Sequence, residues 1–245
     1  MRIVDGSVLR LIRQWLEAPV VEPVAKGKGP KVTRNDKGTP QGGVISPLLA
    51  NLYLHWFEVA LLRELRKGHV AAGLVRYADD FVILAGDLSD ALTAFVEERL
   101  EGWLGLRINR EKTRCIDLKD EGQRLDFLGY SLRYDRDLWG RPKKYLNVFP
   151  SPRSLKRERA RLRAMTDKRQ CFTPVPELIA KVNRHLKGWS NYYAYGHPRK
   201  AFRDMNQYVR LRLIAHLERR SQRSYKKPEG QTYYQHLNEL GLITL

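Results

Sequence analysis

The feature that most constrains the fold is the segment from Val75 to Leu84, which reads Val-Arg-Tyr-Ala-Asp-Asp-Phe-Val-Ile-Leu. Strand-forming residues flank two adjacent carboxylates, so the segment predicts a hairpin over residues 74–84 with Asp79 and Asp80 at its tip. Two like charges side by side repel each other unless water or a divalent cation compensates them. The tip is therefore either a solvated acidic turn or a metal-binding turn.

Composition narrows the class of protein. The 245 residues are 42% hydrophobic and carry a formal net charge of +18, which indicates a folded chain with a polyanionic partner. No apolar run is long enough for a membrane span and no signal-peptide core follows Met1, so we expect a cytoplasmic protein with nucleic acid rather than membrane as its partner. Two cysteines and six scattered histidines exclude a disulfide framework and a metal site built on His or Cys.

The charge is distributed unevenly along the chain. Residues 1–150 carry 24 Lys and Arg against 20 Asp and Glu, a net of +4, whereas residues 151–245 carry 21 against 7, a net of +14. This asymmetry predicts two functional units, with a boundary at Phe149-Pro150-Ser151-Pro152, where two prolines interrupt regular structure.

Hydrophobic periodicity predicts helices over residues 7–17, 47–65, 90–104, 153–166, 176–193 and 199–220. Residues 20–38 read as a polar hairpin or loop, and residues 114–118 and 125–132 as short strands. Ser46 and Ser89 are the expected N-caps of the second and third helices. The expected inward faces of the first three helices are Val8, Leu11, Ile12 and Trp15; Leu49, Leu52, Trp56 and Val59; and Leu92, Phe95, Val96 and Trp103. The fold class is α+β, with an antiparallel sheet and helices followed by an all-helical part.

Two further blocks accompany the acidic hairpin. Residues 38–51 read Gly-Thr-Pro-Gln-Gly-Gly-Val-Ile-Ser-Pro-Leu-Leu-Ala-Asn, in which two glycines permit close backbone approach just before a capped helix. Residues 105–113 read Gly-Leu-Arg-Ile-Asn-Arg-Glu-Lys-Thr, where Lys112 would meet a triphosphate or protonate a leaving group. Taken separately, the first block is also compatible with an ordinary loop before a helix, and Lys112 with an ordinary surface lysine.

In this order and spacing, the blocks resemble the reverse transcriptases encoded by group II introns, also called maturases. Residues 38–51 look like motif B of that family, Tyr77-Ala78-Asp79-Asp80 like the metal-binding motif C, and residues 105–113 like motif D. Phe127-Leu128-Gly129-Tyr130 resembles the primer-grip block, and residues 178–193 resemble the maturase-specific thumb, or domain X. Retron-type polymerases share the acidic turn, but Lys187-Gly188-Trp189 points to maturases.

The resemblance implies a palm-type polymerase that uses Mg²⁺, deoxynucleotides and an RNA or RNA/DNA primer-template. Asp79 and Asp80 would hold the metal, and Lys112 would act near the leaving pyrophosphate. The nucleotide or template would contact Gln41, Gly42 and Tyr77, while Phe127, Leu128 and Gly129 would hold the primer end.

The basic second part suits RNA. Its expected phosphate contacts are Arg157, Arg161, Lys181, Arg184 and Lys187. The basic helix over residues 153–163 is also compatible with a merely solvated face, but 21 basic against 7 acidic residues in this part favour RNA contact. Trp189 is either a helix-packing core residue or a platform for unpaired bases, and core packing is favoured for it. The implied domains are a partial palm over residues 1–150, a maturase thumb over 151–225 and a C-terminal extension over 226–245.

The chain departs from the family pattern upstream of Gly38. The family's fingers and its motif A, which brings another metal-binding aspartate, have no counterpart there, where the only acids are Asp5, Glu17, Glu22 and Asp36. We therefore expect an N-terminally truncated polymerase that does not extend primers alone; the alternative is a catalytically inactive remnant that binds intron RNA. Residues 221–245 contain only His236 as a potential endonuclease ligand, so DNA cleavage is not expected.

Overall fold

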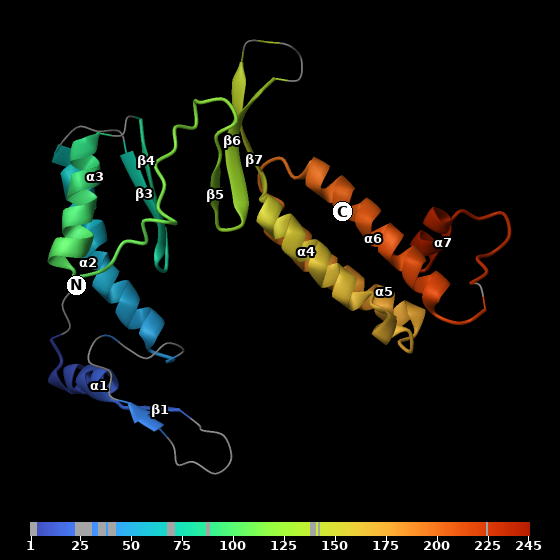
Figure 1. The fold of residues 1–245 in the computed structure, drawn as a ribbon, viewed down its shortest axis with the longest axis horizontal. Helices are drawn as coiled ribbons and strands as arrows, with labels where there is room; N and C mark the ends of the chain where they lie inside the picture. Colours follow the sequence, from blue (N-terminus) through green and yellow to red (C-terminus); the bar gives the residue numbers. More distant parts are fainter. Residues whose placement is uncertain are drawn as a thin grey trace. The chain divides into compact units, whose positions relative to one another are not determined.

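The computed structural model describes residues 4–22, 31–33, 38, 43–67, 72–86, 89–137, 141, 143–223 and 225–245. The chain forms two compact units, Met1–Thr113 and Arg114–Leu245. Helices and small antiparallel sheets occur together, which confirms the predicted α+β class (Figure 1). The functional boundary predicted at residues 149–152 lies within the second unit.

The first unit begins with helix α1, Gly6–Glu17, close to the predicted bounds. Its N-cap is Asp5, whose carboxylate accepts hydrogen bonds from the backbone N–H groups of Ser7 and Val8 at 2.7 and 3.3 Å. Strands β1 (Val20–Glu22) and β2 (Lys31–Thr33) pair antiparallel and confirm the hairpin expected in residues 20–38. Among the described residues, α1 buries no side chain, so its expected apolar face is not covered.

The core of the first unit lies between a hairpin and two helices. Strands β3 (Ala72–Tyr77) and β4 (Asp80–Ala85) confirm the predicted hairpin. Their inward side chains alternate, as expected for a strand with one covered face. Helix α2 (Ser46–Lys67), helix α3 (Asp90–Glu97) and the π-helical segment η1 (Glu98–Trp103) pack on this face (Figure 1). Ser89 caps α3 as predicted.

The expected inward faces were partly wrong. Helix α2 buries Phe57, Leu61 and Leu65 instead of the face that contains Leu52 and Trp56, which are 41% and 48% exposed. Phe57 contacts the ring of Phe81 on β4, with centroids 5.4 Å apart, so the hairpin's single apolar face selects the side of α2 that it covers. The expected inward residue Trp103 is also exposed, because the helix changes to π geometry before it.

The second unit starts with a three-stranded antiparallel sheet in the order β5-β6-β7. Its strands are β5 (Leu125–Phe127), β6 (Tyr130–Arg136) and β7 (Lys144–Pro150). The single strand predicted over residues 125–132 is wrong, since a turn at Leu128-Gly129 divides it into β5 and β6. The strand predicted over residues 114–118 is also wrong, because that segment has no regular structure, and β7 was not anticipated.

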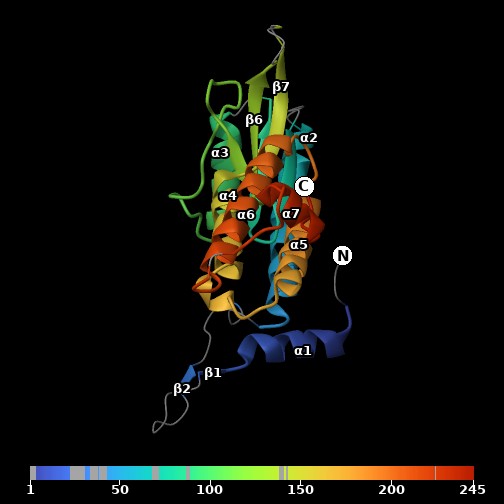
Figure 2. The same cartoon turned by 90° about the vertical axis from the view of Figure 1, so that its right-hand side faces the viewer.

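Helices form the rest of the second unit. The predicted helices are confirmed as α4 (Pro152–Met165), α5 (Val175–Tyr192) and α6 (Arg199–Arg219). The structure adds the short 3₁₀ segment η2 (Lys168–Gln170) and helix α7 (Tyr233–Glu239), which has a capping box formed by Thr232 and Gln235. Helices α4, α5, α6 and α7 lie close together (Figure 2). Their apolar side chains meet in one core, which Leu242 also joins.

Two buried or half-buried asparagines hold the last residues against this helical core. The side-chain amide of Asn183 donates to the Gly241 carbonyl at 2.7 Å and its oxygen accepts from the Ile243 N–H at 3.1 Å. Asn206 pairs in the same way with both backbone groups of Leu245, at 3.1 Å each. Residues 233–245 are therefore part of the packed helical structure.

Candidate functional site

The acidic tip is a strained two-residue turn. Tyr77 pairs with Asp80, which leaves Ala78 and Asp79 as the loop between β3 and β4. Ala78 has a φ of +54°, the sign that a type II′ turn requires at its first central residue and that glycine usually supplies. An L-residue in that conformation costs about 1–2 kcal/mol, so the surrounding contacts must hold the turn in place.

Arg76 supplies those contacts. Its Nη1 donates at 2.8 Å both to the Ala78 carbonyl and to Oδ1 of Asn51, while its Nε meets Oε1 of Glu58 at 2.7 Å. Only 11% of the Arg76 side chain is exposed. The hydrogen bond from Arg76 lowers the pKa of Glu58 below its usual value, although partial burial opposes this effect. Arg76 thus ties the strained turn to two residues of α2, a role that sequence reasoning missed.

The geometry fits part of a Mg²⁺ site. Asp79 and Asp80 are both exposed at the tip, and Mg²⁺ commonly binds through one or two carboxylates, with substrate phosphates and water completing the octahedron. Among the residues that the structure describes, no group of three or more potential ligands gathers around a common point. The donor chemistry therefore suits a metal that also binds a substrate phosphate.

The neighbouring motif residues are placed only in part. Gln41 and Gly42 lie outside the described residues. Helix α2 begins at Ser46 itself, so Ser46 is its first residue and not the N-cap expected before Pro47. Tyr77, on the last position of β3, is 65% exposed beside the acidic tip.

Lys112 lies in a turn after η1 and is exposed. The turn is organised by Asn109, whose side-chain oxygen accepts from the Lys112 N–H at 3.2 Å and whose carbonyl accepts from the Thr113 N–H at 2.9 Å. Arg110 forms ion pairs with Glu97 and Glu101, which fix this segment to the preceding helices. The Lys112 ammonium is accessible to an anionic ligand.

The segment assigned to the primer grip is a tight hairpin turn. Phe127 pairs with Tyr130, and the two loop residues Leu128 and Gly129 have φ values of +48° and +82°. Positive φ at both central positions defines a type I′ turn, which matches the twist of the flanking strands. A Cβ added at Gly129 would lie 2.6 Å from Oη of Tyr193 and 3.0 Å from Oγ of Ser154. The position therefore favours glycine both because of its positive φ and because there is no space for a side chain.

Two helix ends hold this turn. The Gly129 carbonyl accepts from the Ser151 N–H at 2.8 Å and from the Ser154 hydroxyl at 3.0 Å, both at the start of α4. The Leu128 carbonyl accepts from the Tyr192 hydroxyl at 2.8 Å, at the end of α5. Sequence reasoning missed these partners because only the fold brings them to the turn.

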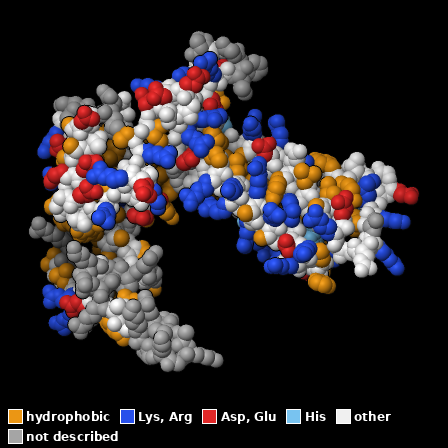
Figure 3. Space-filling view, in the orientation of Figure 1, with side chains coloured by type: hydrophobic (Ala, Val, Ile, Leu, Met, Phe, Trp, Pro, Cys, Tyr) orange, Lys and Arg blue, Asp and Glu red, His pale blue; other side chains and the backbone are white. Residues whose placement is uncertain are grey.

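The predicted RNA-binding cations lie on the surfaces of α4 and α5. All five are exposed, and none forms an ion pair within the described part of the chain: Arg157, Arg161, Lys181, Arg184 and Lys187. Figure 3 shows Lys and Arg side chains spread over this helical part with few acidic ones between them. The arrangement is typical of a surface that binds phosphates without reading sequence.

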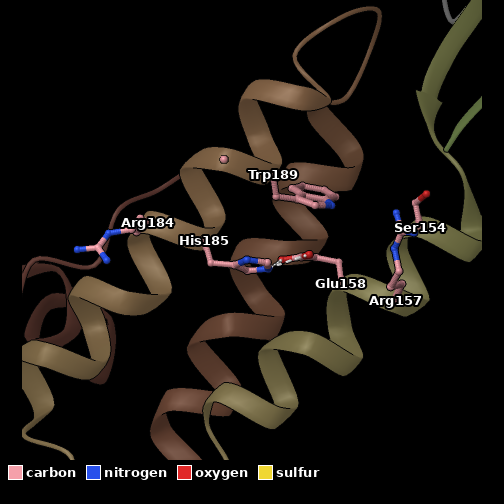
Figure 4. A pocket seen from close by; sticks show the side chains of 7 residues that line it. Ser154, Arg157, Glu158, Arg184, His185 and Trp189 are labelled. Carbon is pink, nitrogen blue, oxygen red and sulfur yellow. Dashed lines mark hydrogen bonds and ion pairs between the residues drawn. The ribbon is translucent and has the colours of Figure 1, made fainter. Parts of the chain in front are cut away.

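A groove of about 400 Å³ separates parts of α4 and α5. Figure 4 shows the side chains of Arg157 and Arg184 on different helices, with Glu158 and His185 pointing toward each other. Nε2 of His185 lies 2.8 Å from Oε1 and 3.0 Å from Oε2 of Glu158. Burial raises the pKa of the Glu158 carboxyl, while His185 opposes that rise.

Trp189 is partly buried and packs on the helical core, as favoured from the sequence. Its ring contacts Tyr193 and Phe202, with centroids 5.0 and 5.6 Å apart. Tyr192 and Tyr195 remain 55% and 77% exposed.

Two family models match this chain. The model for "Reverse transcriptase (RNA-dependent DNA polymerase)" matches residues 3–132, which is more than half of the chain, and the model for "Group II intron, maturase-specific domain" matches residues 155–234. The first match places residues 3–132 in the reverse transcriptase domain family. More particularly, the chain belongs to the group II intron reverse transcriptase/maturase family.

A curated relative is Protein YkfC of Escherichia coli strain K12, which is 33% identical over an alignment that covers 42% of this chain and 34% of the relative. The chain thus spans about a third of the length of that relative. In the described part of the chain, no helix combines the length and apolar character needed to cross a membrane.

Proposed function

We propose that this chain binds group II intron RNA and contributes the later palm of an RNA-directed DNA polymerase. The observation that carries the proposal is the exposed pair Asp79 and Asp80 on a strained turn, which lies inside the region matched by the reverse transcriptase model. Asp79 and Asp80 would hold Mg²⁺, whose chemistry is to activate an attacking hydroxyl and to stabilise a leaving pyrophosphate.

In this proposal the remaining residues bind and orient the substrates. Lys112 meets the phosphate charge of the nucleotide, and Gln41, Gly42 and Tyr77 contact the nucleotide or template. The type I′ turn at Phe127, Leu128 and Gly129 holds the primer end, because its backbone is fixed by both α4 and α5. The turn's rigidity supports that role, since a primer terminus must be positioned closely for an in-line reaction.

RNA binding is tested by the salt dependence of affinity. A variant with Gln at Arg157, Arg161, Lys181, Arg184 and Lys187 is expected to bind a structured group II intron RNA more weakly, with a shallower slope of log K against log salt. Each lost phosphate contact reduces the slope by about 0.7–0.9. The matched control has Gln at five exposed arginines of the first unit and the same net charge: Arg10, Arg13, Arg63, Arg66 and Arg107. Equal slopes for the two variants would exclude α4 and α5 as the RNA surface.

Polymerisation is tested separately by primer extension on an RNA template, with Asp79→Asn as the control. Extension that depends on Asp79 supports a polymerase that is active as this chain. RNA binding without extension supports the second candidate, an RNA-binding maturase that does not polymerise. That candidate is favoured by one observation: within the described residues, no third metal-binding side chain joins Asp79 and Asp80.

A further inference from the structure

We propose that the groove between α4 and α5 admits the sugar–phosphate backbone of an RNA strand, which approaches α5 closely at Gly188. The proposal rests on the proposed RNA-binding function and deepens it, because it names one site on a broad basic surface. The groove is lined by Ser154, Arg157, Glu158, Arg184, His185, Gly188 and Trp189 (Figure 4). Its volume of about 400 Å³ lies within the range of clefts that hold small ligands.

Gly188 is the first reason. It lies inside α5, four residues before the helix ends, where glycine is the least favourable residue apart from proline. Glycines in such positions commonly allow a neighbouring side chain or backbone to pack closely. Here a Cβ built on Gly188 meets nothing within 4 Å, and its φ is not in the left-handed region. Neither packing within the described chain nor backbone conformation explains this glycine, so the open space is available to a ligand.

The charge of the groove is the second reason. Arg157 from α4 and Arg184 from α5 are exposed cations on its two sides. The groove also contains a carboxylate, Glu158, but that side chain is only 6% exposed and is paired with His185. His185 pairs with the carboxylate, and neither guanidinium forms an ion pair within the described residues, so both can bind phosphate through two parallel hydrogen bonds.

The wall beside Gly188 is the third reason. Trp189 follows Gly188 in the groove lining, and its ring is held from behind by Tyr193 and Phe202. A ring fixed in this way offers an apolar surface to a sugar without moving. The groove therefore combines one exposed cation on each flanking helix for the phosphates of a strand, a rigid apolar wall and a helix surface that lacks a side chain.

The test fills the groove at Gly188. Gly188→Leu adds a side chain where the protein itself has no contact, and it also improves helix propensity, so thermal stability should rise by about 2–4 °C or stay unchanged. Affinity for a single-stranded RNA, measured by fluorescence anisotropy, should fall at least tenfold. The matched control is Ala180→Leu, which adds bulk at an exposed position of the same helix outside the groove.

A second variant addresses charge alone. Arg157→Gln with Arg184→Gln should reduce the slope of log K against log salt by about 1.5, which corresponds to two lost phosphate contacts. If the wild-type chain binds RNA and Gly188→Leu binds equally well while folded, the groove proposal is overturned and the proposed function stands. If the wild-type chain does not bind RNA, the proposed function fails, and the groove proposal fails with it.

Discussion

The turn between β5 and β6 gives the most specific prediction. Gly129 there has a positive φ, and it also leaves no space for a side chain. Gly129→Ala places a Cβ 2.6 Å from Oη of Tyr193 and 3.0 Å from Oγ of Ser154, at a φ of +82°. The matched control is Gly122→Ala, which has nearly the same φ of +84° but no atom within 4 Å of the added Cβ. The difference between the two variants isolates the packing requirement.

The magnitude follows from what surrounds the new methyl group. Both variants lose about 1–2 kcal/mol for an L-residue in the left-handed region. Only Gly129→Ala adds overpacking, which costs about 1–3 kcal/mol, and it also disturbs the hydrogen bond from Ser154, worth about 1 kcal/mol. The Tyr193 ring cannot move aside easily, because it is 2% exposed and contacts Trp189, Tyr130 and Tyr192 at centroid distances of 4.8–5.0 Å.

We therefore expect Gly129→Ala to unfold about 2–4 kcal/mol more easily than Gly122→Ala, as measured by urea denaturation followed by circular dichroism. Tyr193→Phe removes the oxygen nearest the new Cβ, so adding it to Gly129→Ala should recover part of the loss in a double-mutant cycle. Equal unfolding free energies for the two alanine variants would refute the reasoning, and so would a complete lack of coupling between positions 129 and 193.

Three further predictions concern other parts of the chain. Arg76→Met removes the hydrogen bonds that Arg76 donates to the Ala78 carbonyl and to Glu58, which then keeps only His55 beside it in the described part of the chain. The unfolding free energy in urea denaturation should fall by about 2 kcal/mol, and more than for Arg66→Met at an exposed position without an ion pair in the described residues. Equal losses for the two variants would contradict this. Burial lowers the pKa of His216 in the folded protein, because the buried site disfavours the charged imidazolium. The stability contributed by neutral His216 is therefore fully present above the unfolded-state pKa of about 6.5 and is lost as pH falls through the folded-state pKa. In the His216→Asn variant the urea midpoint should depend less on pH below about 6.5 than in the wild-type chain. Parallel curves of midpoint against pH for the variant and the wild type would contradict this prediction. Mn²⁺ should broaden the backbone NMR signals of residues 77–81 strongly in the wild-type chain and much less in a variant with Asn at both Asp79 and Asp80. Equal broadening in the two proteins would show that these carboxylates do not bind the metal.

Local features explain how much of the fold was predictable. The start of helix α3 was predicted correctly because its cap, Ser89, accepts a hydrogen bond from the backbone N–H of Leu92, only three residues away. The β3–β4 hairpin was predicted correctly because the alternation of inward and outward residues can be read within the segment itself. The face of α2 was predicted wrongly because several of its faces are apolar. Only contact with the hairpin selects Phe57 over Trp56.

The candidate site divides in the same way. The sequence by itself determined the acidic turn, the order of the polymerase motifs and the concentration of cations in the second part, since each is a pattern of residues close together in the chain. Only the tertiary structure decided that Arg76 connects the strained turn to α2 by hydrogen bonds. It also decided that the hydroxyls of Ser154 and Tyr192 donate to the backbone of the turn at Leu128 and Gly129. It alone brought Glu158 to His185 across the groove beside Gly188. Apart from the hydrogen bond from Arg76 to Ala78, these contacts join residues 18 to 64 positions apart. No local propensity encodes them, and they form only when burial of the apolar faces brings the elements together.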